Sequence, residues 1–205
     1  MSAPRRNGPP RLIALGASTG GVEALAEVLA AFPADCPPTI VVQHMPEFFT
    51  RSFAGRLDGL CAARVEEAWD GAPLERGRVW LAPGGARHLE IAACGGCSVR
   101  LFEADPVNRH RPSVDVAFRS AARCVGRGAA AALLTGMGRD GALGLREMRE
   151  AGARTYAQDR DSSAVWGMPR AALELGAVAE TTPLSQIATS LLGSLQPSKE
   201  PLSWP

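Results

Sequence analysis

The sequence is poor in several residues that common enzyme chemistries require. It contains one lysine, Lys199, in a Pro- and Ser-rich segment near its end, and one tyrosine, Tyr156. A phosphate-binding loop with its lysine, a lysine Schiff base and a serine–lysine pair are therefore poor candidates. Histidine is also scarce, since only His44, His88 and His110 are present. Any acid–base chemistry by imidazole near neutral pH depends on these three positions.

Strong net charge and long hydrophobic runs are missing as well. The 22 Lys and Arg residues nearly balance the 21 Asp and Glu residues, and the net charge is +1. Bulk charge thus gives no reason to expect nucleic acid or an anionic membrane as a partner. No apolar run approaches the roughly 20 residues that a membrane helix needs, and the N-terminus lacks the apolar stretch of a signal peptide. We therefore expect no membrane insertion.

The five cysteines form an odd set without regular spacing, which fits a reducing cytoplasm better than an exported protein. Cys94 and Cys97 make a single C-x-x-C pair. No second pair completes a zinc site, and the pair falls on a predicted hairpin turn rather than at the start of a helix. We expect a cytoplasmic protein that requires neither metal nor cofactor.

The chain reads as one domain over residues 11–194, between flexible tails at 1–10 and 195–205 that are rich in Pro, Ser and Arg. Short apolar runs typical of strands recur along the domain, each followed by apolar residues at helical spacing: 11–15, 39–42, 129–134 and 154–157. This alternation predicts an α/β fold with a doubly wound, mainly parallel sheet and helices on both faces.

One region departs from this alternation. From Val65 to Phe102 the apolar runs are short and are split by Gly and Pro, which predicts a small antiparallel insert with a hairpin at Gly95 and Gly96. Before this region, Thr50 is expected to cap the helix that follows the second strand.

Residues 16–21, with the sequence GASTGG, directly follow the first predicted strand and begin the first predicted helix. They match the G-x-S-x-G elbow, in which small neighbours allow a sharp turn that lifts the serine oxygen out of the sheet edge. Ser18 is thus a candidate nucleophile, and the N–H of Thr19 is placed to bind an oxyanion at a helix N-terminus. The same glycines also suit a phosphate-binding loop, or a tight turn in which the serine caps a helix. The motif alone leaves these alternatives open.

Two residues of matching chemistry follow other predicted strands. His44 comes at the end of the second strand, and Asp140 comes shortly after the buried run of alanines. Because the carboxyl ends of parallel strands share one edge of a sheet, His44 is the best-placed base for Ser18, and Asp140 can orient its imidazole. Simpler roles also fit: a structural histidine at position 44, and at 140 an N-cap for the helix that begins near Gly141.

The other two histidines fit this site less well. His88 begins a strand of the predicted insert and is expected to be a surface residue. His110, in the run NRHRP, lies on a predicted loop that can approach the site. The chain order Ser18, His44, Asp140 also differs from the order of serine, acid and histidine in α/β-hydrolases, so the elbow belongs to a different topology.

Six motifs, in order, make the sequence similar to the catalytic domain of the bacterial chemotaxis protein-glutamate methylesterases, the CheB type. They are GASTGG at 16–21, VVQHM at 41–45, LAPG at 81–84, HRPSVD at 110–115, LLTGMGRDG at 133–141 and WGMPR at 166–170. The resemblance extends from Leu12 to about Leu192, nearly the whole chain.

The resemblance implies that Ser18 is the nucleophile, His44 the base and Asp140 its orienting residue, and that the N–H of Met137 helps that of Thr19 to bind the oxyanion. It also implies a substrate class: γ-glutamyl methyl esters on the cytoplasmic helices of methylated chemoreceptors. Methanol would be released, and deamidation of receptor glutamines would be a second activity. No oligomeric state is implied.

Members of this family typically carry an N-terminal receiver domain. Ten residues precede the first predicted strand here, so the chain is either a stand-alone member or a fragment that contains the catalytic domain. Two other functions remain as alternatives. One is an esterase or amidase that acts on receptors of another signalling pathway, and the other is a non-catalytic module that binds phosphate at residues 16–21.

Overall fold

The structure is a computed structural model that describes residues 11–92 and 97–195. The predicted hairpin turn at Gly95 and Gly96 lies outside the described residues, as does Cys94. The predicted tails at 1–10 and 195–205 also lie outside them, apart from Leu195.

Seven strands of the described segments form one sheet, in which every neighbouring pair is parallel. Their order across the sheet is β3-β4-β2-β1-β7-β8-β9. The strands are β1 (Leu12–Ala17), β2 (Thr39–Gln43), β3 (Arg64–Glu67), β4 (Arg78–Leu81), β7 (Ala129–Leu133), β8 (Arg154–Gln158) and β9 (Glu180–Thr182). The predicted doubly wound parallel sheet is confirmed, with β1 at its centre.

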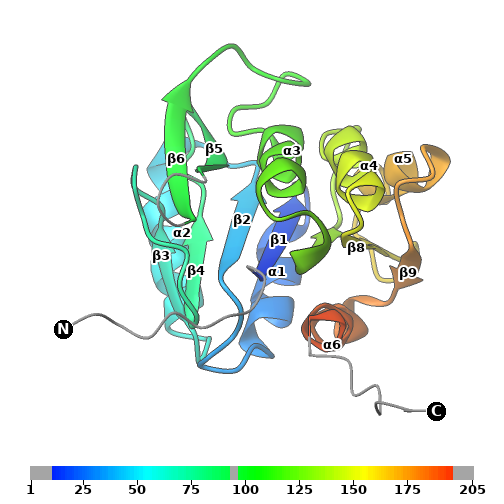
Figure 1. Cartoon of the computed structure of the whole chain (residues 1–205), viewed down its shortest axis with the longest axis horizontal. Coiled ribbons are helices and arrows are strands. Elements are labelled where there is room, and N and C mark those ends of the chain that lie inside the picture. The colour runs from blue at the N-terminus through cyan, green and yellow to red at the C-terminus, as the bar shows by residue number, and fades with distance from the viewer. Residues whose placement is uncertain (1–10, 93–96, 196–205) are drawn as a thin grey trace, which may run out of the picture.

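Helices cover both faces of this sheet (Figure 1). They are α1 (Gly21–Ala30), α2 (Glu47–Asp58), α3 (Val114–Cys124), α4 (Ala142–Glu150), α5 (Met168–Glu174) and α6 (Leu184–Ser194), with a short 3-10 turn at Gly126–Gly128. Helices α1, α2 and α6 share one buried apolar cluster, and α3, α4 and α5 share the other. Successive residues of β1 alternate between the two clusters, as the pleat of a strand requires: Leu12 faces α3, and Ile13 faces the opposite layer.

A two-stranded antiparallel hairpin, β5 (Arg87–Ala92) and β6 (Ser98–Glu103), lies beside α3 (Figure 1). Leu89 and Ile91 of β5 belong to the same apolar cluster as α3. The predicted antiparallel insert is therefore present but shorter than expected. Its first half was assigned wrongly, because β3 and β4 are parallel members of the main sheet. A short apolar run between two turns has the same sequence pattern whether its strand pairs with a parallel or an antiparallel neighbour.

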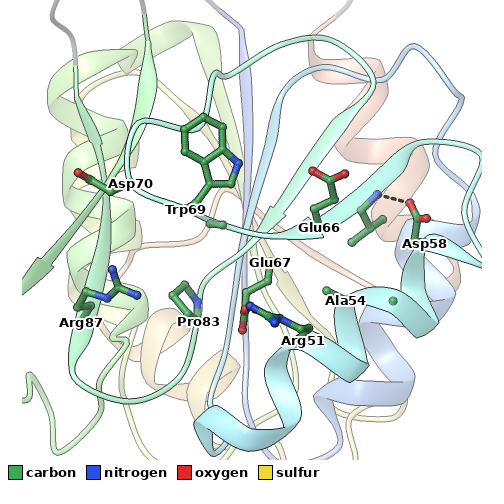
Figure 2. Close-up of a pocket in the computed structure, with 12 residues that line it drawn as sticks. Arg51, Ala54, Asp58, Glu66, Glu67, Trp69, Asp70, Pro83 and Arg87 are labelled. Carbon is green, nitrogen blue, oxygen red and sulfur yellow. Dashed lines mark hydrogen bonds and ion pairs between the residues drawn. The ribbon is translucent and has the colours of Figure 1, made fainter.

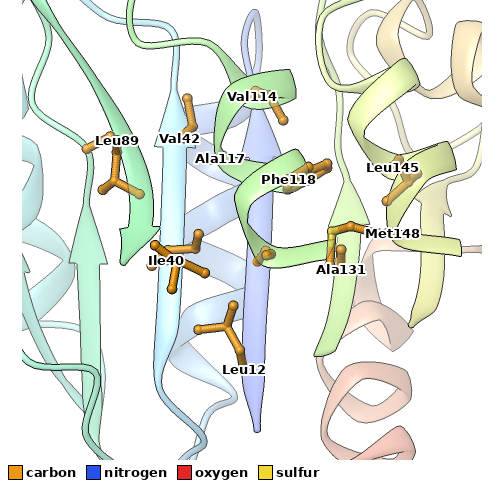
Figure 3. Packing of buried hydrophobic residues seen from close by; sticks show 14 of the residues in the cluster. Leu12, Ile40, Val42, Leu89, Val114, Ala117, Phe118, Ala131, Leu145 and Met148 are labelled. Carbon is orange, nitrogen blue, oxygen red and sulfur yellow. The ribbon is translucent and has the colours of Figure 1, made fainter. Parts of the chain in front are cut away.

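Helix α3 packs unusually close to the carboxyl half of β1 (Figure 3). Gly16 of β1 faces Val114 in the first turn of α3, and a Cβ atom at position 16 would overlap a Val114 methyl group. The neighbouring strand β7 offers small side chains over Ala129–Ala132. These small residues allow the N-terminus of α3 to lie directly over the ends of β1 and β7.

The expected cap at Thr50 is wrong. Helix α2 begins at Glu47, after Pro46, so Thr50 lies inside its first turn. There its hydroxyl donates to the Glu47 carbonyl oxygen and contacts the Glu67 carboxylate on β3. Thr50 therefore connects α2 to the sheet instead of capping the helix.

Candidate active site

The three candidate residues Ser18, His44 and Asp140 lie at one edge of the sheet. Ser18 follows β1, His44 follows β2, and Asp140 lies beyond β7, so the serine is at the end of the strand between the other two. The N–H of His44 donates to the carbonyl oxygen of Ala17 at 3.1 Å, and the N–H of Ser18 donates to that of Thr135 at 3.0 Å. The main chain thus aligns all three strand ends, as expected where the carboxyl ends of parallel strands form a crevice.

Gln43 connects the serine and histidine segments. Its amide nitrogen Nε2 donates to the carbonyl oxygens of Ser18, at 2.9 Å, and of His44, at 3.0 Å. The side chain is buried, so these bonds hold the two turns against each other without competition from water. Sequence reasoning did not identify Gln43, although its place directly before His44 was a usable signal.

His44 and Asp140 are in direct contact. His44 Nε2 lies 2.9 Å from Asp140 Oδ2, with 8% of the histidine side chain and none of the aspartate side chain exposed. Asp140 also accepts hydrogen bonds from the N–H of Val114, from Ser113 Oγ and from Asn108 Nδ2. Burial alone would raise the pKa of Asp140, but these hydrogen bonds outweigh it and lower the pKa to about 2.

The sequence also allowed Asp140 to cap the helix that begins near Gly141, and this alternative is wrong. Helix α4 begins at Ala142 after Gly141, with no side-chain cap. Asp140 instead accepts from the N–H of Val114, the first residue of α3, at 2.7 Å. One oxygen, Oδ2, receives both that N–H and His44 Nε2. One carboxylate therefore contacts the imidazole and caps a helix at the same time.

This contact determines the tautomer of His44. An ionised carboxylate only accepts hydrogen bonds, so Nε2 must carry the proton that Asp140 receives. In the neutral ring, Nδ1 then holds the free lone pair. Nδ1 is buried and has no hydrogen-bond partner among the residues that the structure describes. The nitrogen available as a base is thus Nδ1, opposite to the usual arrangement in which Nδ1 faces the acid.

The turn after β7 leaves little space beside Ser18. A Cβ atom at Gly136 would lie 2.8 Å from Ser18 Cβ and would overlap the sulfur of Met168. Next along the chain, Met137 is 70% exposed. In the described part of the chain, the backbone N–H groups of Thr19 and Met137 donate to no other residue. Both groups are thus available on the two turns that meet at Ser18.

The two remaining histidines have separate places. His110 stacks on the imidazole of His44, with ring centroids 3.7 Å apart and planes within 6° of parallel. His88 was expected at the surface, and this is wrong, because it is fully buried. Its Nδ1 accepts the N–H of Ser113, and its Nε2 lies 3.1 Å from the carbonyl oxygen of Asp105. His88 supports the segment before α3 and lies outside the His44 contacts.

Within residues 11–92 and 97–195, no cluster of three or more His, Cys, Asp or Glu side chains is arranged to hold a metal ion. Cys97 is partly buried and unbridged, and its partner in the C-x-x-C pair lies outside these residues. No helix in the described segments combines the length and apolar character needed to cross a membrane.

A pocket of about 530 Å³ lies at the β3 edge of the sheet, between α2 and the segment from β3 to β5 (Figure 2). Among its charged groups, Arg51 pairs with Glu67 at 3.5 Å, and Asp58 accepts the N–H of Val65 at 2.8 Å. Ser18, His44 and Asp140 do not line it. The strand-end site is therefore the candidate active site.

Comparison with known proteins identifies the family to which the chain belongs. A family model described as CheB methylesterase matches residues 13–191. The chain belongs to the CheB methylesterase family. The catalytic domain of the Thermotoga maritima CheB methylesterase has a crystal structure that superposes with a TM-score of 0.87 at 35% identity, covering 91% of this chain and 99% of that one. The resemblance inferred from the six motifs is confirmed.

Curated members of the CheB methylesterase family are similar over most of this chain. A protein-glutamate methylesterase/protein-glutamine glutaminase of Agrobacterium fabrum is 56% identical over 190 residues, which cover 93% of this chain and 54% of that protein. A protein with the same name, numbered 1, from Caulobacter vibrioides is 56% identical over 181 residues, 88% of this chain and 53% of that protein. The chain thus spans about half the length of the curated relatives it matches.

Proposed function

We propose that this chain is a serine hydrolase that removes methyl groups from γ-glutamyl methyl esters of methyl-accepting chemotaxis receptors. Ser18 is the nucleophile, His44 the general base and Asp140 the residue that orients the imidazole. The observation that carries the proposal is the buried His44–Asp140 hydrogen bond beside the Ser18 turn. It occurs in a chain of the CheB methylesterase family.

In the first half-reaction, Ser18 Oγ attacks the ester carbonyl carbon while His44 Nδ1 takes the hydroxyl proton. Asp140 keeps its bond to Nε2–H and stabilises the imidazolium that forms. The N–H groups of Thr19 and Met137 donate to the negatively charged oxygen of the tetrahedral intermediate. When the intermediate collapses, the C–O bond to the methoxy group breaks, and the Nδ1 proton leaves with it as methanol. The glutamyl group remains on Ser18 as an ester.

In the second half-reaction, a water molecule attacks this ester and loses its proton to His44 Nδ1. The proton then returns to Ser18 Oγ as the acyl bond breaks. The product is a glutamate side chain in its acid form, which releases its proton to solvent and becomes a carboxylate. A receptor glutamine can follow the same course, with ammonia in place of methanol. The names of the curated relatives, which include both methylesterase and glutaminase, support this second activity.

The receptor partner and the cellular location are part of the same proposal. The substrates are the cytoplasmic helices of methylated chemoreceptors, and the protein acts in the cytoplasm as a domain over residues 11–194. Support comes from the relatives' names and from the odd cysteine set without a disulfide framework. No cofactor or metal enters any step of the proposed mechanism.

The direct test measures methanol release from methylated cytoplasmic fragments of chemoreceptors by the native chain and by Ser18→Ala. We expect release by the native chain and background release by the variant, because Ser18 Oγ is the attacking atom of the proposed mechanism. Labelling with a fluorophosphonate provides a substrate-independent control. If the native chain neither releases methanol nor is labelled at Ser18, the hydrolase proposal is wrong.

These two assays, together with a measurement of phosphate binding, separate the alternatives. Labelling of Ser18 without methanol release would indicate an esterase or amidase for receptors of another pathway. Binding of inorganic phosphate that survives His44→Ala, without labelling, would indicate a phosphate-binding module. A phosphate site has no need for the buried His44–Asp140 contact.

A further inference from the structure

The loop before α3 contains a tight two-residue turn, Val107–His110, which we call the 107–110 turn. Its outer residues pair through both backbone bonds: Val107 N–H donates to the His110 carbonyl at 3.1 Å, and His110 N–H donates back at 2.9 Å. Asn108 and Arg109 between them have φ values of 52° and 68°. This conformation is costly for residues other than glycine, and least so for Asn and Asp. Such backbone strain persists where surrounding contacts require it.

The first such contact comes from Asn108. Its Nδ2 donates to Asp115 Oδ2 at 2.7 Å and to Asp140 Oδ1 at 2.8 Å. One amide group thus connects two buried carboxylates. By engaging Oδ1, together with Ser113 Oγ at 2.7 Å, it sets the plane of the Asp140 carboxylate. That plane determines where Oδ2 meets His44 Nε2.

The second contact comes from His110. Its ring lies flat against the ring of His44, 3.7 Å away and within 6° of parallel. Burial, and after it the nearness of His44, lowers the pKa of His110, although Asp140 acts in the opposite direction. A neutral His110 can stack on His44 without charge repulsion. The stack covers one face of the His44 ring, so a ring flip would require the two rings to separate.

We propose that the 107–110 turn positions the catalytic imidazole, with Asn108 acting through Asp140 and His110 acting by stacking on His44. Together they hold His44 in one plane and one tautomer, with the proton on Nε2 and the lone pair on Nδ1. Asn108 and His110 are positioning residues, since the structure gives neither a contact with Ser18. The inference rests on the proposed function for its effect on rate, but the state of the His44 ring can be measured without any activity.

The first readout is nitrogen NMR of the 205-residue chain with isotope-labelled histidine at neutral pH, in which the ring shifts report which nitrogen carries the proton. With three histidines in the sequence, His44 is assigned by its loss in His44→Gln. We expect a single Nε2–H form in the native chain and a mixture of tautomers in His110→Ala and Asn108→Gly. A native Nδ1–H form, or variants with the native pattern, would overturn the proposal.

The second readout is the rate of fluorophosphonate labelling at Ser18, resolved into a maximal rate and an apparent affinity for the reagent. We expect His110→Ala and Asn108→Gly to lower the maximal rate roughly 10- to 100-fold with little change in affinity. His110→Phe keeps a flat ring over His44 and should restore most of the rate. Equal loss in His110→Phe and His110→Ala would contradict the stacking role.

The choice of variants separates a loss of positioning from a loss of folding. Glycine at 108 adopts φ of 52° without strain, so Asn108→Gly should fold as well as Asn108→Ala or better. Both variants lose the amide donor and should lose the same rate. A rate that instead follows the folded fraction of each variant would show a merely structural role. If the native chain is not labelled at all, the hydrolase proposal fails, and the NMR result alone decides the positioning inference.

Discussion

The carboxylate of Asp140 contacts both the His44 imidazole and the first turn of α3. Oδ2 receives His44 Nε2 at 2.9 Å and the first N–H of α3 at 2.7 Å, while Oδ1 receives Ser113 and Asn108. All of these partners are donors. An asparagine at this position has one oxygen, which accepts, and one NH2 group, which only donates. Whichever way the amide is turned, its NH2 group faces donors on one of the two sides and cannot accept their hydrogen bonds. Chemistry and folding are therefore coupled through one residue.

Asp140→Asn should lower both activity and stability. We expect kcat to fall by about 10³- to 10⁴-fold, since His44 loses its orienting partner, and the free energy of unfolding to fall by about 1–3 kcal/mol. Methanol release and urea denaturation measure the two effects. Asp58→Asn is the matched control, because it makes the same change at a carboxylate on α2 that accepts the N–H of Val65 and lies away from His44, so kcat should remain close to the native value. Activity of Asp140→Asn close to native would show that the carboxylate has no role in the reaction.

At the scale of elements, the site depends on how closely α3 approaches β1. The N-terminus of α3 supplies Val114 N–H to Asp140, and Gly16 leaves the space that Val114 fills. The hairpin β5–β6 supports α3 from the side, where Ser120 Oγ accepts the N–H of Ile91 at 2.9 Å. Helix α4 also packs closely against α3, because a Cβ atom at Gly144 would lie 2.8 Å from Phe118 Cβ.

Gly16→Ala should separate α3 from β1. The added methyl group meets a valine whose χ1 is restricted in a helix, so the helix must move, at a cost of about 1–3 kcal/mol in stability and with a loss of kcat. Gly55→Ala on α2 is the control, since no described heavy atom outside the neighbouring residues and backbone of α2 lies within 4 Å of its added Cβ. It should raise stability by roughly 0.5–1 kcal/mol and leave kcat unchanged. Similar stability changes in the two variants would contradict the close-packing argument.

At the scale of the whole molecule, the buried Asp140 carboxylate makes the free energy of unfolding depend on pH in the acid range. The pKa of Asp140 lies at about 2 against an ordinary value of 3.8. A lowered carboxylate pKa stabilises the fold above the unfolded value, and this contribution is lost as pH falls from about 3.8 towards 2. The contribution of Asp115 to this pH dependence has the opposite sign. Burial raises the pKa of Asp115, so its charged form destabilises the fold near neutral pH.

Comparison of the native chain with Asp140→Asn reports the contribution of Asp140 together with its effect on Asp115, whose pKa the charge of Asp140 raises. The stability advantage of the native chain over Asp140→Asn should decrease by about 2 kcal/mol between about pH 5 and about pH 2. Urea denaturation at a series of pH values measures this difference. An advantage that stays constant over this range would mean that the carboxylate is not held ionised by its hydrogen bonds.

Much of the fold and the placement of the candidate site could be predicted from the sequence. Ser18, His44 and Asp140 each follow a run of buried apolar residues, and parallel strands bring such positions to one edge. Asn108 and Gln43 were missed, because a polar residue on a turn or at a strand end has many structural uses. The contact of Asn108 with Asp140 joins residues 32 positions apart, and no local pattern reports such a pairing. The place of β3 in the parallel sheet was missed for the same reason.

The sequence by itself determined the alternation of strands and helices, the glycine turn at Ser18 and the membership in the CheB methylesterase family. These features depend on local periodicity, on backbone freedom at glycine and on the order of motifs. Only the tertiary structure decided which helix Asp140 caps, which nitrogen of His44 it contacts and which ring covers that histidine. Those outcomes arise from the packing of α3, β1 and the 107–110 turn, where distances of a few tenths of an ångström decide which donor meets which acceptor.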